Sequence, residues 1–125
     1  VLEYQGNKFK VIDYGAITTQ AKAPFPLRLQ KIYNEMCILH KTYKPDAMSM
    51  EKLFYNNNAK TVIDVAQARG VITLSAQNYG VPIFEYTPLQ VKQTHLLWRY
   101  VTDIQAVRLW EISADIYKIQ ILVFV

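Results

Sequence analysis

The stretch that decides the fold is Pro45-Asp46-Ala47-Met48-Ser49-Met50-Glu51-Lys52-Leu53-Phe54. Within it, the run from Ala47 to Met50 is short and mostly apolar, which indicates a buried strand that ends at Glu51. The following residues, 53–58, contain three asparagines in a row and are predicted to form a loop. A carboxylate therefore stands where a buried strand meets a loop.

Helical patterns lie on both sides of this strand. Residues 27–43 carry apolar side chains at helical spacing, and Pro45 lies just past their end. Residues 59–79 form a second predicted helix, with Asn58 as its N-cap and Gly80 as its terminator. This second helix is apolar on more than one face, so we expect it to be buried on two sides. One side can pack on a sheet, and the other needs a further element or a second subunit.

Two further patterns predict strands. Residues 1–4 and 8–14 flank Gly6-Asn7, a pair that suits the tight turn of a hairpin. Residues 82–86 indicate another buried strand. Strands that alternate with helices favour an α/β domain with a partly parallel sheet.

Composition sets the class of protein. With 125 residues, 51% hydrophobic and 19% charged, the chain suits one small globular domain and is not globally disordered. No run of about 18 apolar residues lacks a charge, so we expect no spanning helix and no membrane partner. The first residues show no secretory signal, and the single Cys37 excludes an internal disulfide framework. We therefore expect a cytoplasmic protein.

The charge divides the chain into two parts. The formal net charge is +4, which permits a nucleic-acid partner without arguing for one. Residues 1–93 hold 11 basic and 7 acidic side chains, and residues 94–125 hold three of each together with both tryptophans. We expect residues 1–93 to form the folded core and residues 94–125 to be an atypical apolar tail. The β-prone end of that tail, residues 119–125, would be an aggregation hazard if exposed.

Several consecutive motifs in residues 1–93 resemble the RuvC family of bacterial Holliday-junction resolvases. They are Tyr4-Gln5-Gly6-Asn7-Lys8, the stretch 45–54 quoted above, Asn58-Ala59-Lys60-Thr61, Ala66-Gln67-Ala68-Arg69-Gly70 and Phe84-Glu85-Tyr86-Thr87-Pro88-Leu89-Gln90-Val91-Lys92-Gln93. Their order makes the match specific, although no single motif would.

The resemblance implies an RNase H-like fold, in which helices flank a mixed sheet of an antiparallel hairpin and parallel strands. It also implies a homodimer that acts in DNA recombination and repair, with four-way junction DNA as substrate and branch-migration helicase proteins as possible partners. Each subunit of such a dimer nicks one strand by Mg²⁺-assisted hydrolysis of a phosphodiester. Carboxylates suit this chemistry because Mg²⁺ is a hard cation that prefers oxygen ligands.

The chain departs from the family pattern at both ends. The family's first catalytic Asp lies on a strand that would precede Val1, and nothing like its C-terminal Asp-Ala-Ala-Asp-Ala helix occurs here. We expect an RNase H-like fold that lacks its first strand and has an atypical C-terminus. Of the family's usual four carboxylates only Glu51 can be placed, so this chain is predicted not to cleave. A rival hypothesis is a non-catalytic module that binds branched DNA or only dimerises.

The resemblance assigns roles to six residues. Glu51 matches the metal-binding and catalytic Glu segment, although position alone would favour a solvated strand-end carboxylate. Phe54 matches an aromatic wedge that stacks on a base at the junction, or else it packs under its loop. The remaining DNA-binding candidates are Asn57, Asn58, Arg69 and Lys92. For Asn58 the alternative is a helix N-cap, and for the two basic residues it is a solvated surface charge.

Two features of the sequence leave alternatives open. Gly70, beside Arg69, favours close helix packing or a dimer contact, because glycine costs about 1 kcal/mol in a helix relative to alanine. The tail suggests translation in a shifted reading frame. Residues 108–111 can be coded AGG-TTA-TGG-GAA, which one base later gives Gly-Tyr-Gly, the loop that follows Val-Lys-Gln in the family. The nucleotide sequence would decide this hypothesis.

Overall fold

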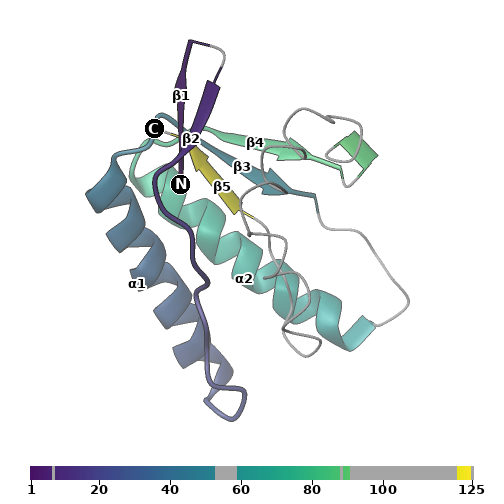
Figure 1. Cartoon of the computed structure of the whole chain (residues 1–125). Coiled ribbons are helices and arrows are strands. Elements are labelled where there is room, and N and C mark those ends of the chain that lie inside the picture. Colours follow the sequence, from purple (N-terminus) through teal and green to yellow (C-terminus); the bar gives the residue numbers. More distant parts are fainter. Residues whose placement is uncertain (7, 53–58, 88, 91–120, 125) are drawn as a thin grey trace.

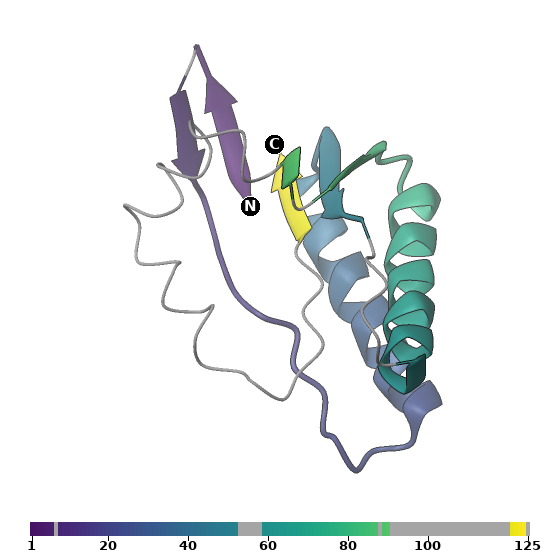
Figure 2. The same cartoon turned by 90° about the vertical axis from the view of Figure 1, so that its right-hand side faces the viewer.

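The computed structural model describes residues 1–6, 8–52, 59–87, 89–90 and 121–124. In these residues a five-stranded mixed sheet has the strand order β2-β1-β5-β3-β4, and two helices lie side by side on one of its faces (Figures 1 and 2). The elements in chain order are β1 (Leu2–Gln5), β2 (Lys8–Val11), α1 (Phe25–Tyr43), β3 (Ala47–Glu51), α2 (Ala59–Asn78), β4 (Ile83–Tyr86) and β5 (Ile121–Phe124).

The predicted hairpin is confirmed, with a shorter second strand than expected. β1 and β2 pair antiparallel from Leu2↔Val11 to Gln5↔Lys8, and Gly6 in the turn has a φ of +48°. β2 ends at Val11, and residues 12–14 do not continue it. The N–H groups of Ile12 and Asp13 instead both donate to the carbonyl oxygen of Val1, at 2.9 and 3.4 Å.

Helix α1 begins two residues earlier than predicted. Its first turn contains Pro26, which is tolerated there because the first N–H groups of a helix have no intrahelical acceptor. Past its last residue, Tyr43, Lys44 adopts a left-handed conformation with φ of 46°, and its N–H donates to the carbonyl of His40 at 3.0 Å. The helix therefore ends before Pro45, as the sequence indicated.

Helix α2 ends as predicted but is buried on one side only. Gly80 has a φ of +67°, and the N–H of Val81 beyond it donates to the carbonyl of Ala76 at 2.9 Å. Ile72 and Ala76 are buried, whereas Ile63 and Leu74 are 59% and 54% exposed. Within the described residues no element covers the second apolar side, so burial of that side by a further element or a second subunit stays a prediction.

The core lies between the two helices and β3. Its buried side chains are Met48 and Met50, which alternate along β3, Met36 of α1, Ile72 and Ala76 of α2, and Val81 between α2 and β4. β3, predicted as a buried strand, is confirmed by this pattern. β4 pairs parallel to β3, but its predicted burial is wrong, because Phe84 and Tyr86 are 52% and 42% exposed. The reason is its place as an outer strand of the described sheet.

Strand β5 brings part of the atypical tail into the sheet. It pairs antiparallel to β3 through four residue pairs, from Ala47↔Phe124 to Met50↔Ile121, and parallel to β1 through one pair, Leu2↔Phe124. The β-prone segment is therefore paired on both of its edges. The predicted boundary at residues 93 and 94 lies outside the described residues. Among the helices described, none combines the length and apolar character that crossing a membrane requires.

Candidate functional site

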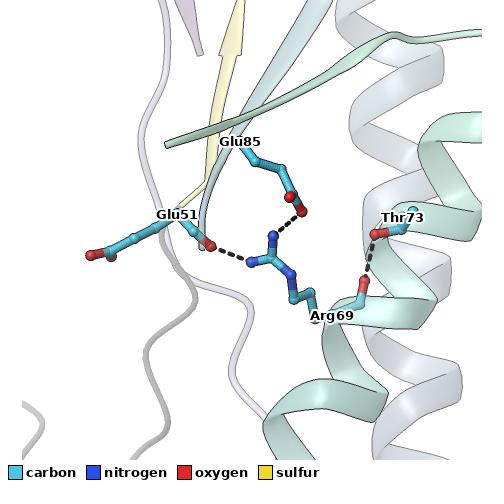
Figure 3. Close-up of polar contacts among 4 residues, drawn as sticks. All are labelled: Glu51, Arg69, Thr73 and Glu85. Carbon is cyan, nitrogen blue, oxygen red and sulfur yellow. Dashed lines mark hydrogen bonds and ion pairs between the residues drawn. The ribbon is translucent and has the colours of Figure 1, made fainter. Parts of the chain in front are cut away.

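Glu51 is the last residue of β3, and the alternation of that strand sets the direction of its side chain. Met48 and Met50 face the helices and are buried, so Ala47, Ser49 and Glu51 belong to the opposite face and are half-buried. Figure 3 shows the Glu51 carboxylate extending away from the other labelled side chains. Among the described residues, no hydrogen bond or ion pair engages this carboxylate.

Arg69, in the middle of α2, reaches the ends of two strands. Its guanidinium donates one hydrogen bond to the main-chain carbonyl of Glu51 and another to the carboxylate of Glu85 on β4 (Figure 3). The Arg69 side chain is 14% exposed and that of Glu85 is 45% exposed. A nearly buried cation thus has an anionic partner and a carbonyl partner, as a buried charge requires.

The two carboxylates near Arg69 belong to opposite faces of the sheet. Glu85 pairs with Met50 in the parallel register, so its side chain is on the helix face with Arg69. Glu51 is one residue further along β3, so its side chain is on the other face. Arg69 therefore contacts the charge of Glu85 but only the main chain of Glu51.

The backbone around Glu51 is held by strand pairing on the β4 side. The N–H of Lys52 donates to the carbonyl of Tyr86 at 2.8 Å, and the N–H of Met48 donates to the carbonyl of Pro82 at 2.9 Å. The carboxyl ends of the parallel strands β3 and β4 thus meet at one edge, where Glu51 pairs with Tyr86. This pairing and the Arg69 contact fix the site's main chain from two directions.

A carboxylate oxygen fits a hard divalent cation, which prefers oxygen ligands. Glu51 fits one ligand position for such an ion. Within the described ranges, no group of three or more His, Cys, Asp or Glu side chains could hold a metal. Glu85 does not add a second ligand, because its carboxylate is turned to Arg69 on the other face. The described residues thus offer one donor of a metal site.

Most of the other predicted site residues cannot be placed. Phe54, Asn57, Asn58 and Lys92 lie outside the described residues. Arg69 is described, and it contacts Glu51 and Glu85.

Gly70 corrects an expectation about helix packing. A Cβ atom at Gly70 would meet nothing within 4 Å, so close packing within this chain does not explain the glycine. The residue is exposed on α2, on the side that no described element covers.

Glu85 is the residue that sequence reasoning missed. Its motif, Phe84-Glu85-Tyr86, was used for the family resemblance, but no role was assigned to the acidic side chain. The signal was an acidic residue inside a short apolar strand, together with an arginine within an otherwise apolar helix. The arginine charge on a packed helix needs an anionic partner, so the two could have been paired.

His40 was expected to be an ordinary histidine, and its surroundings are those of a core residue. It is buried and stacks on Tyr79 with ring centroids 5.3 Å apart. Ser75 Oγ donates to the carbonyl of Ile72 at 2.7 Å and lies 3.4 Å from His40 Nε2, so the hydroxyl oxygen is the acceptor for that ring nitrogen. Burial lowers the pKa of His40.

Comparison with known proteins extends this picture. The family model described as crossover junction endodeoxyribonuclease RuvC matches residues 1–98. The RuvC protein of Brevibacillus brevis is 52% identical over 93 residues, which is 74% of this chain and 56% of that protein. The RuvC protein of Alkaliphilus oremlandii is 53% identical over 93 residues, with 74% and 57% covered. The chain thus spans a little more than half the length of these curated relatives.

Solved structures agree on the fold. The Thermus thermophilus RuvC structure superposes with a TM-score of 0.65 at 26% identity and covers 74% of this chain and 57% of that one. The structure of T. thermophilus RuvC in complex with Holliday junction substrate gives a TM-score of 0.66 at 24% identity, covering 69% and 55%. The expected α/β fold of the RNase H-like type, with a mixed sheet and helices, is confirmed. From the family match over residues 1–98 and these likenesses, the chain belongs to the RuvC family.

Proposed function

We propose that this chain is the nuclease core of a Holliday-junction resolvase, a crossover junction endodeoxyribonuclease that acts in DNA recombination and repair. The observation that carries the proposal is Glu51, a carboxylate at the end of β3 that no described residue engages. Its sequence context matches the metal-binding Glu of the RuvC family, to which the chain belongs. The relatives that are 52% and 53% identical to it over 93 residues are named for this activity.

In this proposal Glu51 supplies one ligand to Mg²⁺. When bound, such an ion polarises phosphoryl oxygen atoms and supports the attack of water on the phosphodiester. Glu51 itself offers an oxygen donor on the open face of the sheet. Its main chain is fixed by the pairing of Lys52 with Tyr86 and by the contact with Arg69, so the donor is presented from a rigid strand end.

The proposed DNA contacts follow β3 and β4 in the chain. Phe54 would stack on a base as a wedge, which contributes about 1–3 kcal/mol for each stacked base. Asn57, Asn58 and Lys92 would contact backbone phosphates, which position the protein on the DNA. Arg69 was proposed as a further phosphate contact, but its guanidinium donates to two protein groups, which supports a different role.

A homodimer is part of the proposal, as are branch-migration helicase proteins as partners. The exposed apolar side of α2 supports self-association, because Ile63 and Leu74 are more than half exposed there. An apolar hollow lined by Leu29, Tyr33, Val71 and Leu74 lies between α1 and α2 on the same side. Monomeric proteins seldom expose large contiguous apolar areas without a partner.

The alternative is a non-catalytic module that binds branched DNA or only dimerises. The observation that favours it is the small number of metal ligands, since the described residues bring one carboxylate, Glu51, to the site. The two functions are separable because DNA binding needs basic and aromatic contacts, whereas hydrolysis needs several metal ligands.

The test uses a synthetic four-way junction with the 125-residue chain and Mg²⁺. We expect the chain to leave the junction intact, because Glu51 is the one family carboxylate that can be placed in it. Specific, symmetric nicking by this chain would contradict that expectation. The flanking nucleotide sequence tests the proposed division into a core of residues 1–93 and a frame-shifted tail of residues 94–125. If no other frame encodes the family's C-terminus, the tail is a true replacement.

A further inference from the structure

We infer that Arg69 is a positioning residue that holds the main chain of Glu51 and thereby limits the rotamers of its side chain. The inference rests on the proposed function, in which Glu51 is a metal ligand. Arg69 does not contact the carboxylate. It acts on the main-chain carbonyl of Glu51, to which its guanidinium donates, and on the carboxylate of Glu85.

The first step is the position of the anchor. Arg69 lies within α2, ten residues after the first residue of that helix, Ala59. α2 contributes Ile72 and Ala76 to the core, so the Arg69 main chain is part of a packed element. Thr73 also donates to the carbonyl of Arg69 at 2.9 Å, within the helix. A guanidinium on this rigid base can fix a strand end against the helix.

The second step is that the two hydrogen-bond acceptors of Arg69 belong to residues whose side chains lie on opposite faces of the sheet. Glu85 is on the helix face and takes the charge-assisted hydrogen bond of the guanidinium. Glu51 accepts with its carbonyl, and its side chain continues to the opposite face (Figure 3). Because Glu85 supplies the anion for Arg69, the cation is not drawn to the carboxylate of Glu51.

The third step is the choice of arginine. A guanidinium is planar and presents several N–H donors in a fixed fork, so it can hold two acceptors at a defined angle. Here Nη1 donates to the Glu51 carbonyl and Nη2 to Glu85. A lysine keeps the positive charge but has a flexible stem and no planar fork, so it cannot reproduce this geometry. Arg69→Lys therefore keeps the positive charge and removes the geometry that we propose positions Glu51.

The experiment measures the χ1 rotamer of Glu51 by three-bond NMR couplings in the full 125-residue chain. We expect a single dominant rotamer in the wild type and averaged couplings in Arg69→Lys. Arg28→Lys is the matched control, because Arg28 donates to Thr19 at 3.0 Å on α1, far from Glu51 in the sequence and on another element. Its Glu51 couplings should equal those of the wild type. Averaged couplings in the wild type, or unchanged couplings in Arg69→Lys, would overturn the inference.

A second variant keeps the test decisive if Arg69→Lys fails to fold. Glu85→Gln removes the anion that holds Arg69 on the helix face while leaving the arginine in place. The guanidinium then loses its charge-assisted hydrogen bond and holds the Glu51 carbonyl less firmly, so we expect the Glu51 couplings to become averaged. A Glu51 rotamer identical to that of the wild type would count against the inference.

Paramagnetic broadening by Mn²⁺ separates this inference from the proposed function. Amide signals of residues 50–52 should broaden in the wild type and not in Glu51→Gln, and the broadening in Arg69→Lys should fall severalfold. If Glu51→Gln leaves the broadening unchanged, Glu51 is not a ligand and the proposed function fails. The rotamer measurement, which uses no metal, would still decide whether Arg69 positions Glu51.

Discussion

Arg69 of α2 donates a hydrogen bond to the main-chain carbonyl of Glu51, a residue 18 positions earlier at the end of β3. The contact joins the helix layer to the sheet at the point where the candidate metal ligand lies. The same guanidinium is paired with Glu85 on β4, so one side chain connects three elements. Stability and site geometry are therefore coupled at Arg69.

Because Arg69 connects α2 to β3 and β4, we expect Arg69→Ala to lower the free energy of unfolding. The substitution removes two hydrogen bonds that involve a charged group and leaves Glu85 without its cation. Glu85 is 45% exposed and is partly screened by solvent, so we expect a total loss of about 2–3 kcal/mol. Urea unfolding followed by circular dichroism measures it. Arg28→Ala, which loses a single bond to Thr19, should cost about 1 kcal/mol or less. Equal losses in the two variants would contradict the assignment.

The same substitution at two glycines should have opposite effects. Gly70 lies inside α2, and Gly80 follows that helix with a φ of +67°. A Cβ atom would meet nothing within 4 Å at either position, so packing does not distinguish them. Gly70→Ala should stabilise the chain by up to about 1 kcal/mol through helix propensity. Gly80→Ala should destabilise it by about 1 kcal/mol, because the left-handed region is unfavourable for alanine. Thermal unfolding of both variants checks this, and a shift of the same sign in both would refute it.

We expect the folded chain to lose stability in mild acid because of His40. Burial lowers its pKa below the usual value, near which the unfolded chain titrates, about 6.5. Below that pH the unfolded state binds a proton that the folded state does not. The contribution of His40 to stability is therefore complete above about pH 6.5 and falls as the pH drops toward the folded-state pKa, by at most about 1.4 kcal/mol per pH unit.

The check is urea unfolding of wild type and His40→Leu between pH 5 and 8. Leucine can fill much of the buried space and cannot titrate. We expect the difference in unfolding free energy between the two proteins to shift in favour of the variant as the pH falls. A difference that does not depend on pH would show that His40 is protonated equally in the folded and unfolded chains.

The β1–β2 hairpin should be the part of the sheet that opens first. It is joined to the remaining strands through one residue pair, Leu2↔Phe124, whereas β5 is joined to β3 through four. Amide hydrogen exchange should therefore be faster in β1 than in β3. Val123→Pro, which removes an N–H in β5, should raise exchange in the hairpin while α1 remains protected. Equal protection of β1 and β3 would contradict this order.

The sequence predicted elements that local signals define. Gly80 marked the end of α2, Gly6 marked the hairpin turn, and the apolar run around Met48 and Met50 marked the core strand. Each depends on residues that are neighbours in the chain, so periodicity and turn chemistry were sufficient. The strand end at Glu51 was predicted as well, whereas its assignment as a metal ligand came from its sequence context and stays a prediction.

Features that depend on distant partners were not predicted. The exposure of Phe84 and Tyr86 follows from the outer place of β4, which the strand itself does not encode. β5 pairs with β1 and β3 across more than 70 residues of chain, and its direction in the sheet has no local signal. The role of Glu85 likewise appears only when α2 is placed beside β4. These three features depend on contacts between residues far apart in the chain, which local sequence patterns do not encode.

The most direct test of the proposed function is a gel-shift comparison of a four-way junction with a linear duplex of the same sequence. The 125-residue chain should bind the junction at least tenfold more tightly at fixed salt, because its proposed contacts fit the branched form and not only the phosphate charge. Phe54→Ala should weaken junction binding more than duplex binding. Equal, weak binding to both DNAs would contradict a junction-binding RuvC core and leave only a scaffold or dimerisation role.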